Sequence, residues 1–135
     1  MSSITQVKTA IASTLGSISG LRTYARQPDN LTPPMAFPSL SSVAYHGAMG
    51  NGMVTQTYDI TVIVGRASER SAEALLDTYM SYGTGGIRYA LEADRTLGGT
   101  VDTSIVESAG NITTIDANDT TYLAVDFRFI AQVLG

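Results

Sequence analysis

The stretch from Arg88 to Ser108 constrains the fold more than any other part of the sequence. Its first residues suit a short helical turn with Tyr89 and Leu91 as apolar contacts. Gly98-Gly99 then breaks the pattern, because residues without side chains adopt backbone angles that other residues avoid. The segment from Thr100 to Ser108 is rich in Val, Ile and Thr and predicts a β-strand. A strand of this kind must pair with others, so we expect a sheet with helices on one side.

Two main helices are predicted, each with an apolar stripe along one side. The first runs from about Ile4 to Leu15, and Ser3 and Gln6 form a capping box at its start. The second follows Ser68, which can act as its N-cap, and is stopped by the glycines that begin at Gly83. Its stripe has the helical spacing i, i+3, i+4, i+7, i+8 and consists of Ala72, Leu75, Leu76, Tyr79 and Met80.

A long β-hairpin is predicted in the first half of the chain. Its clearest strand is Gln56 to Val64, in which apolar and polar residues alternate, and its other strand is Ser39 to Tyr45. The segment from His46 to Met53 contains three glycines and connects the two strands. Leu21 to Ala25 predicts a short strand. Gln27 to Pro38 predicts an irregular arm, because it holds all four prolines of the chain.

The last strand is predicted from Thr121 to Val133. Apolar and polar residues alternate along it. This pattern indicates one buried face and one face that contacts solvent or a partner. Before it, Gly110 and Asn111 suggest a turn, Ile112 to Ile115 a short strand, and Asp116 to Asp119 a second turn. Residues 1–135 therefore predict one α+β domain. It has a mixed, mainly antiparallel sheet flanked by two main helices, with a long β-hairpin and a proline-rich arm.

Composition narrows the function classes. The chain has 135 residues, a charged fraction of 15% and a formal net charge of −4. The low charge is compatible with a subunit that hides much of its surface against neighbours. Its arginines are scattered, which argues against specific nucleic-acid binding. Cysteine is absent, so no disulfide or zinc–thiolate site is possible. No signal-like or membrane-spanning segment is seen, so we expect synthesis in a cytosol and no membrane partner.

Catalytic and metal chemistry find little support in the sequence. His46 is the only histidine, and no nucleophile elbow accompanies it. The glycines from Gly47 to Gly52 lack the Lys-Ser/Thr of a phosphate-binding loop, and Asp116 to Asp119 lacks the glycine and glutamate of a calcium loop. Glu92 with Asp94 is read as part of a solvated face. We expect no catalytic residue, cofactor or metal. The alternative is a small hydrolase or ligand-binding domain that uses His46 and Asp59.

One motif carries a resemblance to a known family. The segment Ala93-Asp94-Arg95-Thr96-Leu97-Gly98-Gly99-Thr100-Val101-Asp102, followed by Asp126 to Phe129 in the last strand, is similar to segments of tail terminator proteins of long-tailed bacteriophages. These are the tail completion, or head–tail joining, proteins of the siphophage type, in particular those of actinobacterial phages. The order of predicted elements is similar over nearly the whole chain. The motif residues are Asp94, Leu97, Gly98, Gly99, Thr100 and Asp102.

The resemblance implies a structural virion protein and no enzyme. It implies a homohexameric ring that caps the tail tube, ends its polymerisation and joins it to the head. The implied partners are further copies of the chain, the major tail tube protein, a head-side stopper or connector protein and the tape measure protein. DNA would only pass through the pore, and assembly would take place in the host cytoplasm. The alternatives within this class are another neck protein or a tail-tube subunit.

Apolar residues in predicted loops are the candidate contacts with neighbours, because exposed apolar side chains without partners are costly. In the proline-rich arm they are Met35 and Phe37, beside Pro33. For Met35 and Phe37, burial in the domain's own core is the other interpretation. At the hairpin tip the candidates are Met49, Asn51 and Met53.

Overall fold

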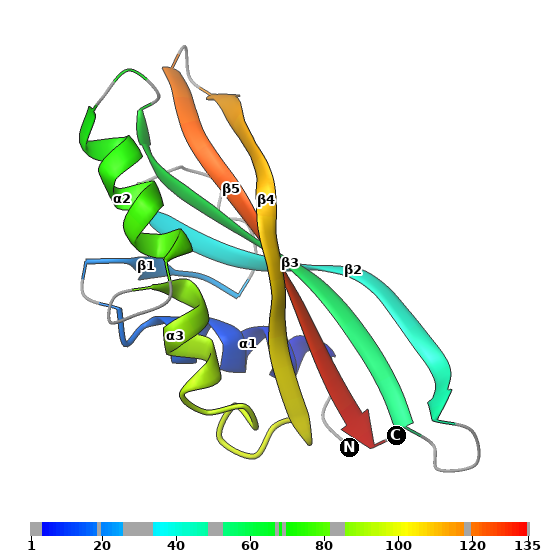
Figure 1. The fold of residues 1–135 in the computed structure, drawn as a ribbon. Coiled ribbons are helices and arrows are strands. Elements are labelled where there is room, and N and C mark those ends of the chain that lie inside the picture. The colour runs from blue at the N-terminus through cyan, green and yellow to red at the C-terminus, as the bar shows by residue number, and fades with distance from the viewer. Residues whose placement is uncertain are drawn as a thin grey trace.

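A computed structural model describes the chain in eight ranges, which are residues 4–18, 20–25, 34–48, 53–66, 68, 70–81, 86–117 and 120–134. Over these ranges the fold is α+β, as predicted. A five-stranded sheet in the order β1-β2-β3-β5-β4 carries the helices on one face (Figure 1). The strands are β1 (Arg22–Thr23), β2 (Met35–Ala48), β3 (Met53–Arg66), β4 (Thr103–Ala117) and β5 (Thr120–Leu134). The helices are α1 (Ile4–Leu15), α2 (Arg70–Met80) and α3 (Ile87–Glu92).

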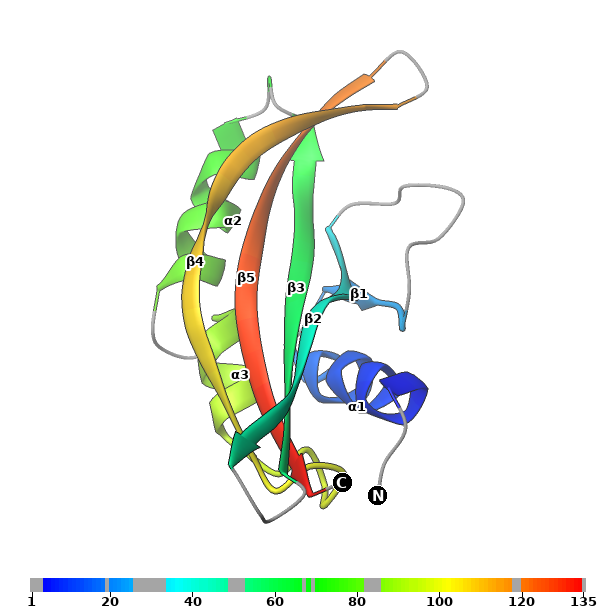
Figure 2. The ribbon, with the colours of Figure 1, turned by 90° about the vertical axis from the view of Figure 1, so that its right-hand side faces the viewer.

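The sheet is antiparallel except at one end. The four long strands β2, β3, β5 and β4 alternate in direction, and β1 pairs in parallel with the first two residues of β2. The centre of the sheet is the pair β3–β5, which runs in register from Met53 opposite Leu134 to Arg66 opposite Tyr122, with one irregularity near its end. The sheet is twisted and curved, so its strands turn markedly from one end to the other (Figure 2).

The main core lies between the sheet and its three helices. The predicted stripe of α1 is buried, and Ile11 is fully covered. From the sheet, Tyr58 on β3 and Phe129 on β5 point into this layer, with ring centroids 6.5 Å apart. The short helix α3 contributes Leu91, which is fully buried as predicted. Tyr89 was also predicted to make an apolar contact, but it is 44% exposed. The apolar residues that alternate with polar ones along β3 and β5 thus lie on the face that the helices cover.

A second, smaller cluster lies on the opposite face of the sheet and corrects the prediction for the proline-rich arm. Met35 is fully buried there and Phe37 is 6% exposed, in contact with Ile63 and Ala124. The arm was predicted to continue to Pro38, but β2 already begins at Met35. Pairing with β3 overrides the local effect of Pro38, which is tolerated because the described pairing of β2 with β1 ends at Ala36.

The segment from Thr103 to Ala117 is one strand, although a turn and a separate strand were predicted within it. Gly110 and Asn111 shift the pairing with β5 instead of reversing the chain, and a second irregularity follows Val106. The continuous partner β5 keeps both halves of β4 in one ladder. The predicted turn from Asp116 to Asp119 does not include Asp116, which still pairs with Thr121, and Asn118 and Asp119 lie outside the described residues.

The predicted hairpin of β2 and β3 extends well beyond the helices. In Figure 1 its end projects away from the body of the domain, at the lower right. Its two strands stay paired out to Ala48 opposite Met53, with irregularities after Leu40 and after Ala44.

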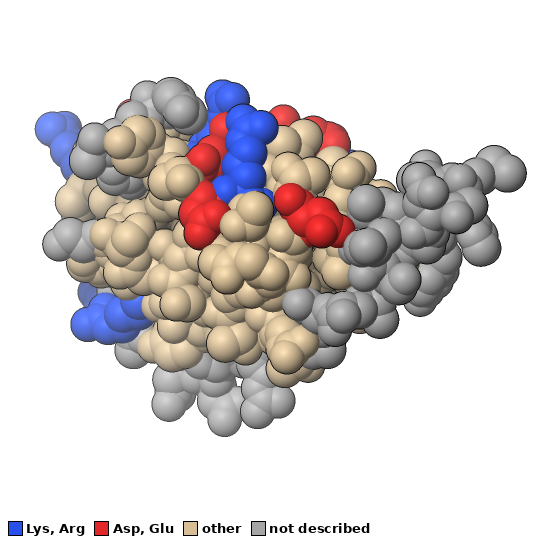
Figure 3. All heavy atoms as spheres, turned by 90° about the horizontal axis from the view of Figure 1, so that it is seen from below, with Lys and Arg blue, Asp and Glu red and all other residues tan. Residues whose placement is uncertain are grey.

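The surface carries few charges, as the composition indicates. Seen from below, most of the face is neither acidic nor basic, and its acidic and basic side chains gather mainly in one mixed group (Figure 3). None of the helices in the described ranges is long and apolar enough to cross a membrane.

Candidate functional site

The loop between α3 and β4 contains the motif that the sequence singled out. Three consecutive residues have positive φ angles, which are 51° at Leu97, 70° at Gly98 and 91° at Gly99. The glycines were predicted to have this role, whereas Leu97 is an unusual residue for it. Its side chain is 3% exposed and belongs to the main core, together with that of Val101. Burial of two apolar side chains therefore anchors a loop whose backbone is otherwise tightly turned.

Asp94 organises the polar side of this loop. Its Oδ1 atom accepts hydrogen bonds from the hydroxyl of Thr96 (2.8 Å) and the N–H of Thr96 (3.2 Å), and its Oδ2 atom accepts one from the N–H of Gly98 (2.8 Å). The Thr96 hydroxyl and the two N–H groups lower the pKa of Asp94 below its ordinary value. At the end of the motif, the N–H of Asp102 donates to the carbonyl oxygen of Gln132 on β5 (2.9 Å). In the described structure, Asp94 therefore shapes the loop.

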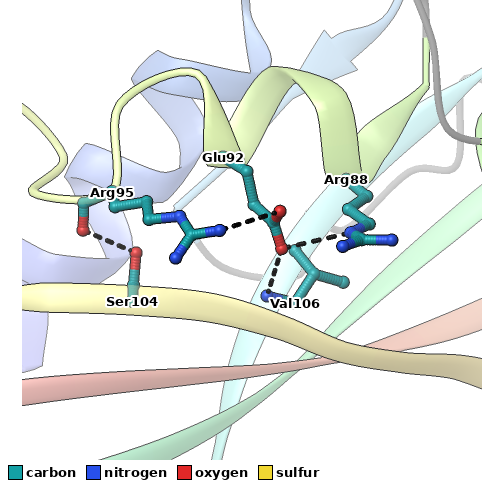
Figure 4. A network of polar contacts seen from close by, with 5 residues as sticks. All are labelled: Arg88, Glu92, Arg95, Ser104 and Val106. Carbon is teal, nitrogen blue, oxygen red and sulfur yellow. Dashed lines mark hydrogen bonds and ion pairs between the residues drawn. The ribbon is translucent and has the colours of Figure 1, made fainter.

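Glu92 links the same loop to β4 and was not recognised from the sequence. Its side chain is 7% exposed, although a solvated position was expected. Its Oε2 atom accepts hydrogen bonds from Nε of Arg88 (3.2 Å) and the N–H of Val106 (3.3 Å), and Oε1 lies 3.5 Å from Nη2 of Arg95 (Figure 4). The hydroxyl of Ser104 donates to the carbonyl oxygen of Arg95 (2.7 Å). The spacing of Arg88 and Glu92 is a signal for an ion pair, but it does not reveal the contact with β4.

Replacing Glu92 with glutamine is expected to lower the free energy of unfolding by about 1–2 kcal/mol, because the charge-assisted hydrogen bonds are weakened at a largely buried position. Urea denaturation followed by circular dichroism measures the change. The matched control is Glu73→Gln on the exposed side of α2, where we expect a change within about 0.5 kcal/mol. Equal effects of the two substitutions would contradict the structural role of Glu92.

A second test compares Gly99 with Gly110. A methyl group added at either glycine has no neighbour within 4 Å. Only Gly99 has a positive φ angle. Gly99→Ala is therefore expected to lower the free energy of unfolding by about 1–2 kcal/mol through backbone strain alone. Gly110→Ala should change it by less than about 0.5 kcal/mol. Thermal unfolding of both variants distinguishes strain from crowding, and a harmless Gly99→Ala would contradict the loop conformation.

A shallow cleft of about 680 Å³ lies between α1 and this loop. Hydroxyl groups of Thr5, Thr9 and Ser13 line one side, and Asp94 is the single titratable side chain among the described residues around it. Asp59, proposed for the hydrolase alternative, lies on the other face of the sheet, because its neighbours Tyr58 and Ile60 point into the main core. The side chain of His46 lies outside the described parts. The structure therefore does not bring Asp59 to this cleft.

The candidate contact residues fall into two groups. Met35 and Phe37 are buried in the smaller cluster of the domain itself, which agrees with the second interpretation of these two residues. Pro33, Met49 and Asn51 lie outside the described residues. Met53 begins β3, between Ala48 and Leu134 in the sheet, and its side chain is outside the described parts. Within the described ranges, no group of three or more His, Cys, Asp or Glu residues could hold a metal ion.

Comparison with known proteins adds no relative. No family model matches the chain, and no curated protein matches it in sequence.

Proposed function

We propose that the chain is a structural subunit of the tail of a long-tailed bacteriophage, and that it acts as a tail terminator. In this role a ring of identical copies caps the tail tube and ends its polymerisation. The observation that carries the proposal is the β2–β3 hairpin, which remains paired while it projects beyond the helices (Figure 1). A projecting hairpin offers backbone and side-chain contacts to a neighbour without disturbing the core that holds it.

The motif loop supports the same proposal. The residues that resemble those of tail terminators form a tightly turned connection, in which Asp94 binds the backbone and Leu97 anchors it to the core. A rigid loop of this kind presents a constant surface to partners. The net charge of −4 suits a pore through which DNA passes without binding, because like charges repel.

The proposed partners follow from this role. Further copies of the chain form the ring, the major tail tube protein lies on one side, and a head-side stopper or connector protein lies on the other. The tape measure protein is a further proposed partner. The proposed location is the neck region of the virion, after assembly in the host cytoplasm.

Electron microscopy of the purified protein, alone and mixed with tail tubes, tests the proposal. A terminator is expected to form rings of limited size and to cap tubes at one end. Long polymers would instead identify a tube subunit, and a monomer that binds no tube would contradict the proposal. Replacing both Met49 and Met53 with serine should reduce the population of rings in mass photometry. The circular dichroism of the subunit should remain unchanged, because the role proposed for both residues is contact with a neighbour.

A further inference from the structure

Within the described ranges, the edge strand β4 contacts α3 and the motif loop along its first half and has no strand on its outer side along its second half. In the first half, the N–H of Val106 donates to Glu92, and Ser104 is bound to the carbonyl oxygen of Arg95 (Figure 4). The N–H of Val106 is thus a backbone group of β4 that already has a partner on α3. In the second half, from Ser108 to Ala117, β5 is the one described strand that pairs with β4. Ile112 is 53% exposed there.

At the other side of the sheet, β2 also lacks a described outer partner over most of its length. β1 pairs only with Met35 and Ala36 of β2. From Phe37 to Ala48, no described strand lies on the side of β2 away from β3. This segment contains no Asp, Glu, Lys or Arg, and the side chains of Ser39, Ser42 and Ala44 are exposed.

Long sheet edges are usually protected by charged residues, because unpaired backbone groups favour pairing with another chain. The open half of β4 contains one charged residue, Asp116, and the open part of β2 contains none. Charged residues therefore protect neither edge well, and the other protective features are Pro38 on β2 and the irregularities in both strands. Because β2, β3, β5 and β4 alternate in direction, β4 and β2 run antiparallel to each other. A second copy can thus place its β2 beside β4 and continue the antiparallel pattern across the junction.

We propose that the open half of β4, Ser108 to Ala117, pairs with the open edge of β2 of a second copy of this chain. The pairing is head-to-tail, so each copy uses both edges and the contact can repeat around a ring. A two-fold pair of β4 strands would cover one edge of each copy and leave both β2 edges open. The inference rests on the proposed ring, and it names the two surfaces that form the ring contact.

Disulfide cross-linking tests the pairing cleanly, because the chain contains no cysteine. Thr113 pairs with Ala124, a residue of the small cluster on the face opposite the helices. Ser39 pairs with Asp59 on β3, which lies on the same face. We therefore combine Thr113→Cys with one of three changes on β2, which are Ser39→Cys, Ser42→Cys and Ala44→Cys. Three positions allow for different registers, since a disulfide needs Cα atoms within about 7 Å.

Under mild oxidation, at least one double variant is expected to form a ladder of covalent dimers, trimers and larger species on non-reducing gels. A reductant should reverse the ladder. Each single variant should remain uncross-linked alone, and a mixture of the matching single variants should give only dimers. The control, Thr113→Cys with Thr78→Cys on the exposed side of α2, should stay monomeric on the gel.

Two results would overturn the inference. Dimers of Thr113→Cys alone would indicate two-fold pairing of β4, and the lack of a ladder for all three combinations would exclude edge pairing. If microscopy finds rings but no ladder forms, the inference fails while the proposed function stands. If a ladder forms but no tube is capped, the proposed function fails while the edge pairing stands.

Discussion

Replacing Phe129 with alanine is expected to lower the free energy of unfolding by about 3–5 kcal/mol. Phe129 is fully buried, lies between Tyr58 on β3 and Val106 on β4 in the sheet, and packs its ring against Tyr58. The substitution removes apolar area and leaves a cavity that rigid neighbouring strands cannot fill. Because domains of this size are stable by about 5–15 kcal/mol, the variant should be partly unfolded at moderate temperature. Urea denaturation followed by circular dichroism measures the loss.

The adjacent residue provides the control. Arg128 is exposed and points to the other face of the sheet, so Arg128→Ala is expected to change the free energy of unfolding by less than about 0.5 kcal/mol. A similar loss for both variants would mean that strand propensity, and not burial, determines the stability of β5. A small loss at Phe129 would contradict its place in the main core.

The second large effect is a loss of stability at alkaline pH. Burial raises the pKa of Tyr58 to about 12, compared with 10.0 for an unperturbed tyrosine. Its hydroxyl donates to Oε1 of Gln56 at 2.6 Å, in a buried pair. Above pH 10 the unfolded chain releases this proton while the folded chain retains it. The raised pKa of Tyr58 therefore contributes about 2–3 kcal/mol to the free energy of unfolding below pH 10. This contribution is lost between about pH 10 and pH 12.

Urea midpoints measured at several pH values from 9 to 12 test this prediction. Burial also raises the pKa of Tyr79, so the wild type should lose stability from two groups. Tyr58→Phe should reduce the slope, and it should lower the stability at pH 9 by about 1–3 kcal/mol because Gln56 loses its buried donor. Identical slopes for the wild type and Tyr58→Phe would contradict the role of Tyr58.

Patterns of apolar residues correctly predicted the helices and strands that are determined by their own local sequence. The helix from Ile4 to Leu15 has the bounds that its apolar stripe indicated, and the alternation in β3 and β5 identified the buried face. The predictions around Pro38 and Gly110 were wrong, because each was read from turn-forming residues alone. In both places a long partner strand supplies a ladder that local chemistry cannot reveal.

The candidate site was less predictable than the fold. The glycine pair was recognised because positive φ angles have a local signature, and both residues have them. The burial of Glu92 depends on Val106, which follows it by 14 residues and approaches only when β4 packs beside α3. The positions of Met35 and Phe37 likewise depend on Ile63 and Ala124, far along the chain. Contacts of this range have no sequence pattern of their own.

The place of β5 in the sheet has a consequence for how the protein folds as it is made. β5 lies at the centre of the sheet, yet its partner β3 emerges from the ribosome long before it, since Met53 pairs with Leu134. Until β5 arrives, the nascent β2–β3 hairpin exposes an apolar strand with Ile60 and Val62 uncovered on one side. Pairing over such a separation is slow. Synthesis in cells should therefore depend on chaperones that hold this hairpin, and expression should improve at low temperature.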